Sequence, residues 1–524
     1  MRPAVSVKLG MPSCTALVRL ALILVHLGEF GGGAGEADLE ALGLAVPAVG
    51  YAAAYYRAWK EVAAHHHSAL PVTLHIRSCR IPLIARAGEC PGSVVATLYD
   101  AALRTGESEI LVAVEGVCAD WQHLRDQLVD GLRQAGHVSN ERVAAALRAV
   151  PRHVFVPGIE PERVYRDEAF PIKYDEDARP VSSSSQPAIM ARMLDQLDVQ
   201  PGQRVLEIGT GSGYNAALLA HLVGETGAVV SVDIDADLVA DARERLAACG
   251  VSQVTVVCGD GGLGWSEHAP YDRIIATVGV WDISPAWVAQ LAAHGRLVVP
   301  LDLQGPQRSI AFQPIDNHLE SVSVVDCGFM RMRGAFAGPE SIHQLGPERG
   351  VLLGLAEQRP IDADGLYAAL AQPGVDVPSG VRVTPNDARR GLGLWLALHE
   401  PAIAGLSAIG AAANHGLVPA LIEYPGRVGT ATVALVGTGA LAALVRLDDD
   451  EQSFELGARP LGQEGHRLAQ RLVGHIHDWN AQGRPGTAGL HVSAYPRDSD
   501  HAAIADANSI IEKRYTRLAL TWAP

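Results

Sequence analysis

Residues 205–214 read VLEIGTGSGY, and this stretch decides the fold of the chain. A short apolar run with the character of a strand leads to Gly209, Gly211 and Gly213, and a helical pattern begins at Tyr214. Glycine suits such a turn because it adopts positive φ and lets a ligand approach the backbone closely. The stretch therefore predicts a buried strand, a cofactor-binding turn and a helix.

Around this turn, residues 199–299 alternate short apolar runs with amphipathic runs. This alternation is typical of a parallel sheet wound with crossover helices, and it predicts a doubly wound α/β domain. The strands are expected at 204–208, 228–232, 254–257, 272–276 and 296–299, and the helices at 214–223, 236–249 and 285–293.

Two aspartates stand where the second and third predicted strands end, and ligands of open α/β sheets bind at these ends. Asp233 can accept hydrogen bonds from ribose hydroxyls, and Asp260, followed by Gly261, can receive the amine of adenine. A single aspartate at such a place is as often a loop cap. Here, however, the ends of all three strands, including the glycine-rich turn after the first, carry residues that suit the same kind of ligand. We therefore expect a nucleotide-type cofactor.

The spacing of the glycines distinguishes between cofactors. A dinucleotide fingerprint needs glycine where this chain has Tyr214, so the match to NAD is incomplete. The pattern in this chain, with Glu207 two residues before the first glycine of the turn, looks like motif I of the class I methyltransferases, which bind S-adenosylmethionine. The residues expected to bind this cofactor are Glu207, Gly209, Gly211, Gly213, Asp233, Asp260 and Gly261. An NAD-dependent oxidoreductase and a scaffold without turnover stay as alternatives.

Further motifs carry a more specific resemblance. They are VPRHVFVP at 150–157, Tyr165-x-Asp167, Pro171-Ile172, Ser185-Gln186-Pro187, Gly259-Asp260-Gly261 and APYD at 269–272. In this order they resemble protein-L-isoaspartate O-methyltransferase. The resemblance implies a Rossmann-like methyltransferase fold, methylation of isoaspartyl or altered aspartyl carboxylates in a peptide or protein, and Ser185 as the active-site hydroxyl. A carboxylate is already ionised at neutral pH, so the reaction needs neither a general base nor a metal.

The chain also departs from that family, mainly on the side of the substrate. It has VSSS at 181–184, Asp233 instead of Glu, and TVGVWD at 277–282. With its added end regions it is similar to the longer homologues of lanthipeptide-type ("FxLD system") pathways, and this implies methylation of one aspartate in a precursor peptide. General protein repair and this dedicated role both stay open.

Three regions are expected along the chain. Residues 1–115 have no assigned role, 116–330 form the methyltransferase domain, and 348–524 form a C-terminal α+β domain with substrate binding as its candidate role. Strands are expected at 71–76 and 110–117, a helix from 121, and a second helix with Ser139 as its N-cap. The C-terminal domain is expected to hold strands at 431–436, 441–447 and 515–522 and a helix at 464–480.

Charge and cysteine usage limit the partners and the compartment. The 58 acidic and 42 basic residues give a net charge of −16, which argues against nucleic acid as a partner. Lys173 and Arg179 are placed where they could offset this field for an acidic substrate. The seven cysteines lack paired spacing and indicate reduced thiols in the cytoplasm. The apolar segment 16–27 is interrupted by Arg19, is too short to span a bilayer, and indicates no membrane partner.

Overall fold

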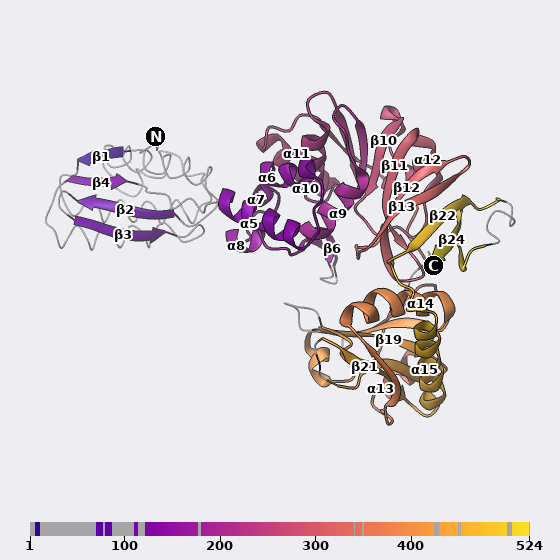
Figure 1. Ribbon diagram of the computed structural model, residues 1–524. Helices are drawn as coiled ribbons and strands as arrows, with labels where there is room; N and C mark the ends of the chain where they lie inside the picture. Colours follow the sequence, from indigo (N-terminus) through magenta and orange to yellow (C-terminus); the bar gives the residue numbers. More distant parts are fainter. Residues whose placement is uncertain are drawn as a thin grey trace. The chain divides into compact units, whose positions relative to one another are not determined.

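A computed structural model of the chain describes residues 6–10, 70–76, 79–85, 109–113, 121–176, 180–339, 341–347, 350–423, 429–448, 450, 452–499 and 506–522 (Figure 1). The segment 16–27 and Arg179 lie outside the described residues. The chain forms two compact units, Met1–Gly131 with Pro151–Glu168 and Leu132–Val150 with Ala169–Pro524. Within the described residues, no helix has both the length and the apolar character that a membrane span needs.

The first unit contains a four-stranded antiparallel sheet and short helices. The strand order is β1 (Ser6–Gly10), β4 (Glu109–Ala113), β2 (Leu70–Ile76) and β3 (Cys79–Ala85). The strand expected at 71–76 is therefore present, and the strand expected at 110–117 is present over its described part, 110–113. The helices are α5 (Trp121–Gln134), α7 (Arg152–Phe155) and α8 (Pro161–Val164). The last residues of α5, from Leu132 onward, belong to the second unit. Arg152 is fully buried and donates to the carbonyl oxygens of Val164, Arg166 and Glu168 at 2.7–3.1 Å.

The second unit is built on a ten-stranded sheet in the order β23-β24-β22-β13-β12-β11-β10-β7-β8-β9. The strands β7, β8, β9, β10 and β11 are parallel, and the rest of the sheet is antiparallel. Their bounds are β7 Arg204–Ile208, β8 Ala228–Asp233, β9 Val254–Cys258, β10 Tyr271–Ala276, β11 Leu291–Asp302, β12 Gln307–Ile315, β13 His318–Asp326, β22 Leu490–Pro496, β23 Ser509–Glu512 and β24 Thr516–Trp522. The parallel half confirms the predicted doubly wound core.

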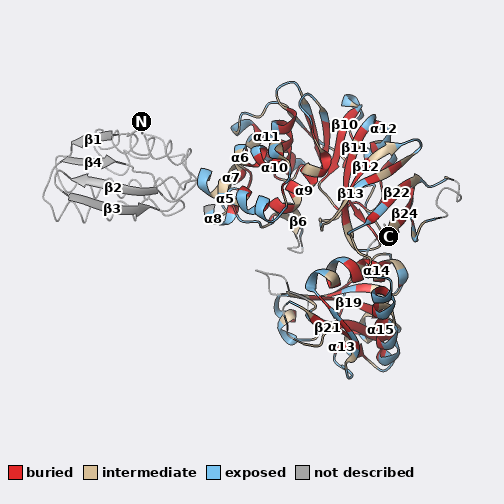
Figure 2. Cartoon of the chain, in the orientation of Figure 1, coloured by how far each residue is buried: buried red, intermediate tan, exposed pale blue. Residues whose placement is uncertain are grey.

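Five helices accompany the sheet: α6 (Glu141–Ala149), α9 (Pro187–Leu197), α10 (Tyr214–Val223), α11 (Ala236–Ala248) and α12 (Pro285–Gln290). Helices α9, α10 and α11 pack on the parallel strands, and α6 packs on α9 and α10. Buried residues lie both on the strands and on the helices that pack against them (Figure 2).

Two boundaries differ from the sequence prediction. The N-cap of α6 is Asn140, whose side chain accepts from Arg142 N, while Ser139 binds the Asp195 carboxylate through its amide and hydroxyl at 2.6 and 2.7 Å. Helix α12 ends at Gln290 instead of residue 293, because Leu291 pairs with Tyr271 in the sheet. Strand pairing overrides the helix propensity of the alanines that follow.

The strand expected at 515–522 is present as β24, but it belongs to the ten-stranded sheet and not to the C-terminal α+β lobe. The antiparallel half bends so that the start of β24 comes back to the end of β11. Lys513, before β24, reaches Asp302 at the end of β11, although β12, β13 and β22 separate these strands. One hydrophobic core accordingly contains both Leu206 of β7 and Leu520 of β24.

The C-terminal lobe contains an eight-stranded sheet with helices α13 (Ala363–Leu370), α14 (Gly393–His399) and α15 (Gly465–Ala481). Its strands follow the order β14 (Ser341–Gln344), β15 (Val351–Leu355), β17 (Ile403–Ile409), β19 (Gly429–Val436), β20 (Leu441–Arg446), β21 (Phe454–Leu461) and β16 (Val377–Val383), and β18 (Ile422–Glu423) pairs with β19. The predicted strands at 431–436 and 441–447 and the helix at 464–480 are therefore confirmed. Trp479 of α15 is fully buried in the core of the lobe.

Candidate functional site

The glycine-rich turn after β7 has a backbone that only glycine accommodates. Gly209, Gly211 and Gly213 have φ of +97°, +52° and +87°. A Cβ atom on Gly209 would lie 2.8 Å from Thr277 Oγ1 and 2.9 Å from Val278 Cγ1. The Thr277 hydroxyl donates to Gly209 O at 2.6 Å. The turn is therefore held against the carboxyl end of β10.

Glu207 lies in β7, two residues before Gly209, and supports the glycine-rich turn. Its side chain is fully buried, and its two carboxylate oxygens accept hydrogen bonds from Asn215 Nδ2 at 2.8 Å and Ser231 Oγ at 2.5 Å. Burial and the negative charge of Asp233 raise the pKa of Glu207 to about 7, against the opposing effect of these two hydrogen bonds. Its carboxylate is therefore enclosed by protein and bonded to two neighbouring side chains, and the cofactor contact expected for Glu207 stays a prediction.

Asp233, at the end of β8, is tied to the same turn. Its Oδ2 atom accepts from Gly211 N at 2.9 Å, and its Oδ1 atom accepts from Asp235 N at 3.1 Å. The side chain is only 8% exposed. A carboxylate offers about four lone-pair positions, so both oxygens can still accept from a pair of ligand hydroxyls.

Asp260 and Gly261 lie beyond the end of β9. Asp260 accepts from Gly262 N at 2.9 Å and from Ala335 N at 2.7 Å, which ties the segment after β13 to this strand end. A Cβ atom on Gly261 would lie 2.6 Å from Ile208 Cγ2, so Gly261 packs on the last residue of β7. The ends of β7, β8 and β9 therefore converge, as the three predicted cofactor positions require.

A two-stranded hairpin, β5 (Phe170–Tyr174) and β6 (Pro180–Ser184), covers the glycine-rich turn. A Cβ atom on Gly211 would lie 3.6 Å from Ser183 O and 3.7 Å from Ser182 Oγ. Ser185 directly follows β6 and is half-buried. Ser185 therefore lies two residues along the chain from Ser183, whose carbonyl oxygen packs on the glycine-rich turn.

An ionic clamp joins the hairpin, the tip of β8 and the segment after β13. Lys173 Nζ lies 2.6 Å from Asp237 Oδ1 and 3.0 Å from Asp235 Oδ1, and Arg333 pairs with the Asp235 carboxylate. Burial raises the pKa of Asp235, but the hydrogen bonds from Arg333 and Lys173 outweigh it and hold that pKa below its usual value. Lys173 was expected to serve an acidic substrate; its charge is instead paired with two carboxylates.

Comparison with known proteins identifies the family. The family described as "Protein-L-isoaspartate(D-aspartate) O-methyltransferase (PCMT)" matches residues 123–333. The protein-L-isoaspartate O-methyltransferase of Methanoculleus marisnigri is 38% identical over 212 residues, which are 40% of this chain and 92% of that protein. This chain belongs to the protein-L-isoaspartate O-methyltransferase family. That of Methanopyrus kandleri is 35% identical over 225 residues, 42% of this chain and 97% of its own length.

Solved structures include members of the same family. A protein-L-isoaspartate O-methyltransferase aligns with 76% of this chain and 100% of its own at 22% identity, with a TM-score of 0.41. The assignment to the family rests on the sequence relatives. As a member of the family, the chain carries its matched region between long additions at both ends.

Two features of this methyltransferase site were missed by sequence reasoning. Thr277 closes the turn through its hydroxyl, and Arg333 completes the clamp on Asp235. Thr277 carries a weak signal, because it follows the end of a predicted strand. Arg333 carries none, because it lies 98 residues from Asp235 in a segment without periodicity.

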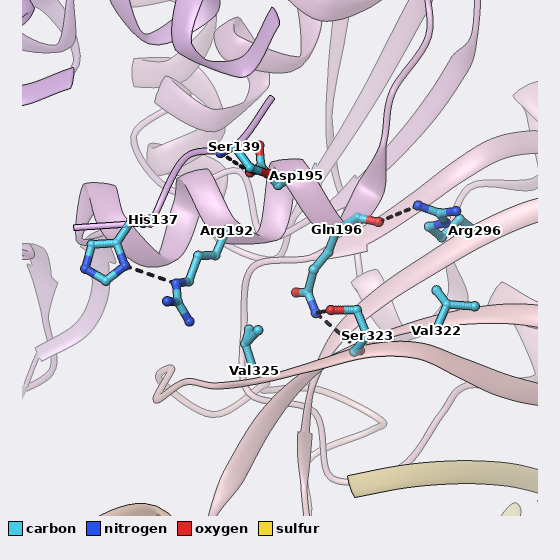
Figure 3. Close-up of a pocket in the computed structure, with 10 residues that line it drawn as sticks. His137, Ser139, Arg192, Asp195, Gln196, Arg296, Val322, Ser323 and Val325 are labelled. Atoms are coloured by element: carbon cyan, nitrogen blue, oxygen red, sulfur yellow. Dashed lines mark hydrogen bonds between the residues drawn. The ribbon is translucent and has the colours of Figure 1, made fainter. Parts of the chain in front are cut away.

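A polar pocket of about 400 Å³ lies elsewhere in the methyltransferase, at the C-terminal half of α9 (Figure 3). Arg192, Asp195 and Gln196 line it from the helix, and Arg296 and Val322 line it from the sheet. The strand tips that surround the glycine-rich turn do not contribute to this pocket. In the described residues, no group of three or more His, Cys, Asp or Glu side chains could hold a metal ion.

Proposed function

We propose that this protein transfers a methyl group from S-adenosylmethionine to the carboxylate of an isoaspartyl or altered aspartyl residue in a peptide or protein. One observation carries the proposal most directly. The hairpin that leads to Ser185 packs on Gly211, and Gly211 also donates its amide to Asp233. The residues proposed for the substrate and for the cofactor thus meet at one turn.

The residues at the strand ends fit the cofactor. The backbone of Gly209, Gly211 and Gly213 leaves no side chain on the turn, and the free lone pairs of Asp233 suit the two ribose hydroxyls. Asp260 and Gly261 would hold the adenine at the end of β9, while Glu207 keeps the turn in place. When bound, S-adenosylmethionine supplies a methyl group attached to a positively charged sulfonium.

The chain itself has to align and enclose the reactants. A substrate carboxylate is ionised at neutral pH and is therefore already a nucleophile. With S-adenosylmethionine bound, one oxygen of that carboxylate would take up the methyl group, and the electron pair of the broken carbon–sulfur bond would stay on sulfur. Ser185 is proposed to hold the other oxygen by a hydrogen bond, and the clamp of Lys173, Asp235 and Arg333 keeps the hairpin closed against water.

The decisive experiment offers methyl-labelled S-adenosylmethionine and an isoaspartyl peptide to the full chain. Base-labile label on this peptide, and none on the matching aspartyl peptide, is the expected result. Calorimetry with S-adenosylhomocysteine and with NAD separates the proposal from an oxidoreductase. Binding of NAD in place of S-adenosylhomocysteine, or tight binding without any turnover, would contradict it.

A dedicated precursor peptide is the second candidate substrate, and the length of the chain favours it. The relatives align over most of their own length but over only about two fifths of this chain, for example 40% with the relative from Methanoculleus marisnigri. The added residues 348–524 are proposed to hold such a peptide. Label on short aspartyl peptides encoded beside the gene, and not on the isoaspartyl peptide, would select this reading over general repair.

We also propose a cytoplasmic location and no nucleic-acid or membrane partner. The net charge of −16 opposes binding to nucleic acid. Among the described cysteines, Cys249, Cys258 and Cys327 are free thiols, which is consistent with a reducing compartment. Fractionation of cells that express the tagged full chain tests the location.

A further inference from the structure

The turn between β23 and β24 reaches the edge of the sheet where the proposed site lies. Asp302 ends β11, whose carboxyl end lies at the same edge as that of β10 because the two strands are parallel. Lys513, in the turn, is nearly fully buried, and its Nζ atom lies 3.4 Å from Asp302 Oδ1. The end of the chain therefore contributes side chains to the carboxyl edge of the methyltransferase sheet.

Asp282 fixes the position of this turn. Its carboxylate is 1% exposed and accepts from Tyr515 N at 2.6 Å and from Thr516 Oγ1 at 2.6 Å. Asp282 lies in the segment 277–282, which begins with the threonine that contacts Gly209. The turn is thus joined by buried hydrogen bonds to the segment that borders the glycine-rich turn.

Two aromatic rings lie about 6 Å from the one arginine in this turn. The guanidinium carbon of Arg514 lies 5.9 Å from the ring centre of Trp281 and 6.0 Å from that of Tyr515. The Tyr515 ring lies 5.4 Å from the ring of Phe336, and Phe336 packs on Gly262, next to the end of β9. Such rings hold a guanidinium in place and leave its donors directed at an acidic partner.

Arg514 differs from the other cations around the proposed site in having no carboxylate partner. Lys173 and Arg333 pair with Asp235, and Lys513 faces Asp302. Arg514 is exposed and makes no hydrogen bond or ion pair with any residue in the described part of the chain. In a protein of net charge −16, an uncompensated guanidinium beside the site offers local attraction to an anion.

We propose that Arg514, which lies near the rings of Trp281 and Tyr515, is a carboxylate-binding subsite for an acidic side chain that flanks the methylated residue of the peptide. The inference rests on the proposed function, because it names a preference of the same substrate site. A guanidinium binds a carboxylate through two parallel hydrogen bonds, so the subsite favours Glu or Asp over Gln or Asn at the flanking position.

The test uses the full chain loaded with S-adenosylhomocysteine and two fluorescein-labelled isoaspartyl peptides that differ only by Glu or Gln at the flanking positions. Anisotropy measures binding without turnover. We expect the wild type to bind the Glu peptides about fivefold more tightly, as one exposed ion pair allows, and Arg514→Ala to abolish the difference. Arg514→Glu should reverse the preference, so that the Gln peptide binds more tightly than the Glu peptide, and about 0.5 M salt should weaken the preference of the wild type.

Arg467→Ala is the matched control, because Arg467 is an exposed arginine of the C-terminal lobe, and it should retain the wild-type preference. A wild type with equal affinity for the Glu and Gln peptides, or a preference that survives Arg514→Ala, overturns the subsite. The same peptides with labelled S-adenosylmethionine report on the proposed function separately: charge-dependent binding without methylation would retain the subsite and refute the methyl transfer.

Discussion

Replacing Glu207 by Gln should change how the stability of the methyltransferase core depends on pH. Glu207 is fully buried, and its pKa is raised from 4.5 to about 7. Glutamine keeps the shape and can still accept from Asn215 and pair with Ser231, but it has no proton to lose. The substitution therefore isolates the effect of ionisation from the effect of packing.

The magnitude follows from the shift in pKa. Between pH 4.5 and about 7 the carboxyl keeps its proton in the folded state and loses it in the unfolded state. The folded state then binds more protons, so the free energy of unfolding falls as pH rises through this window. At about 1.4 kcal/mol per pKa unit, the full loss is about 3 kcal/mol and is complete above pH 7.

Hydrogen exchange of the α10 amides, followed by mass spectrometry from pH 5 to 8 and corrected for intrinsic exchange rates, measures this free energy locally. We expect the wild-type protection to fall with pH relative to Glu207→Gln, and the amides of α15 in the C-terminal lobe to behave identically in both proteins. Equal pH dependence of α10 in the two proteins would refute the buried, proton-retaining state of Glu207.

Three further predictions concern binding and turnover. Asp233→Ala should weaken binding of S-adenosylhomocysteine by about 1.5 to 3 kcal/mol, the cost of lost hydrogen bonds to a charged acceptor, and unchanged calorimetric affinity would rule out the ribose contact. Ser185→Ala should lower kcat while the cofactor affinity stays the same; full turnover would show that another group holds the substrate carboxylate. Asp235→Asn should release Arg333, leave Lys173 paired with Asp237 alone and speed cofactor dissociation about fivefold in stopped flow, whereas an unchanged rate would show that the clamp does not close the site.

The charge state of Asp235 gives this clamp a defined pH window. Its pKa lies below the usual 3.8 in the folded protein, because the bonds from Arg333 and Lys173 outweigh the effect of burial. The clamp therefore contributes its full stability above about pH 4 and loses it as pH falls through the depressed pKa. We expect the dissociation rate of the cofactor to stay constant from neutral pH to about pH 5.

The sequence was sufficient to predict the structure where a short local pattern is compatible with only one backbone conformation. The parallel core and the turn at Gly209 were predicted because strand periodicity, glycine spacing and the acids at the strand ends all belong to short, contiguous stretches. The same reasoning did not show that Glu207 is enclosed by protein or that Lys173 is paired with two carboxylates. Whether a charge is enclosed or already paired depends on residues far away in the chain.

By itself, then, the sequence determined the doubly wound core, the family, and the strand ends at which Asp233 and Asp260 lie. Only the tertiary structure decided that the last strands complete the methyltransferase sheet, that Arg333 clamps Asp235, and that Arg514 meets Trp281. The physical reason is that these contacts join segments tens to hundreds of residues apart. Such pairings follow from how the sheet curls and packs, and no local periodicity encodes them.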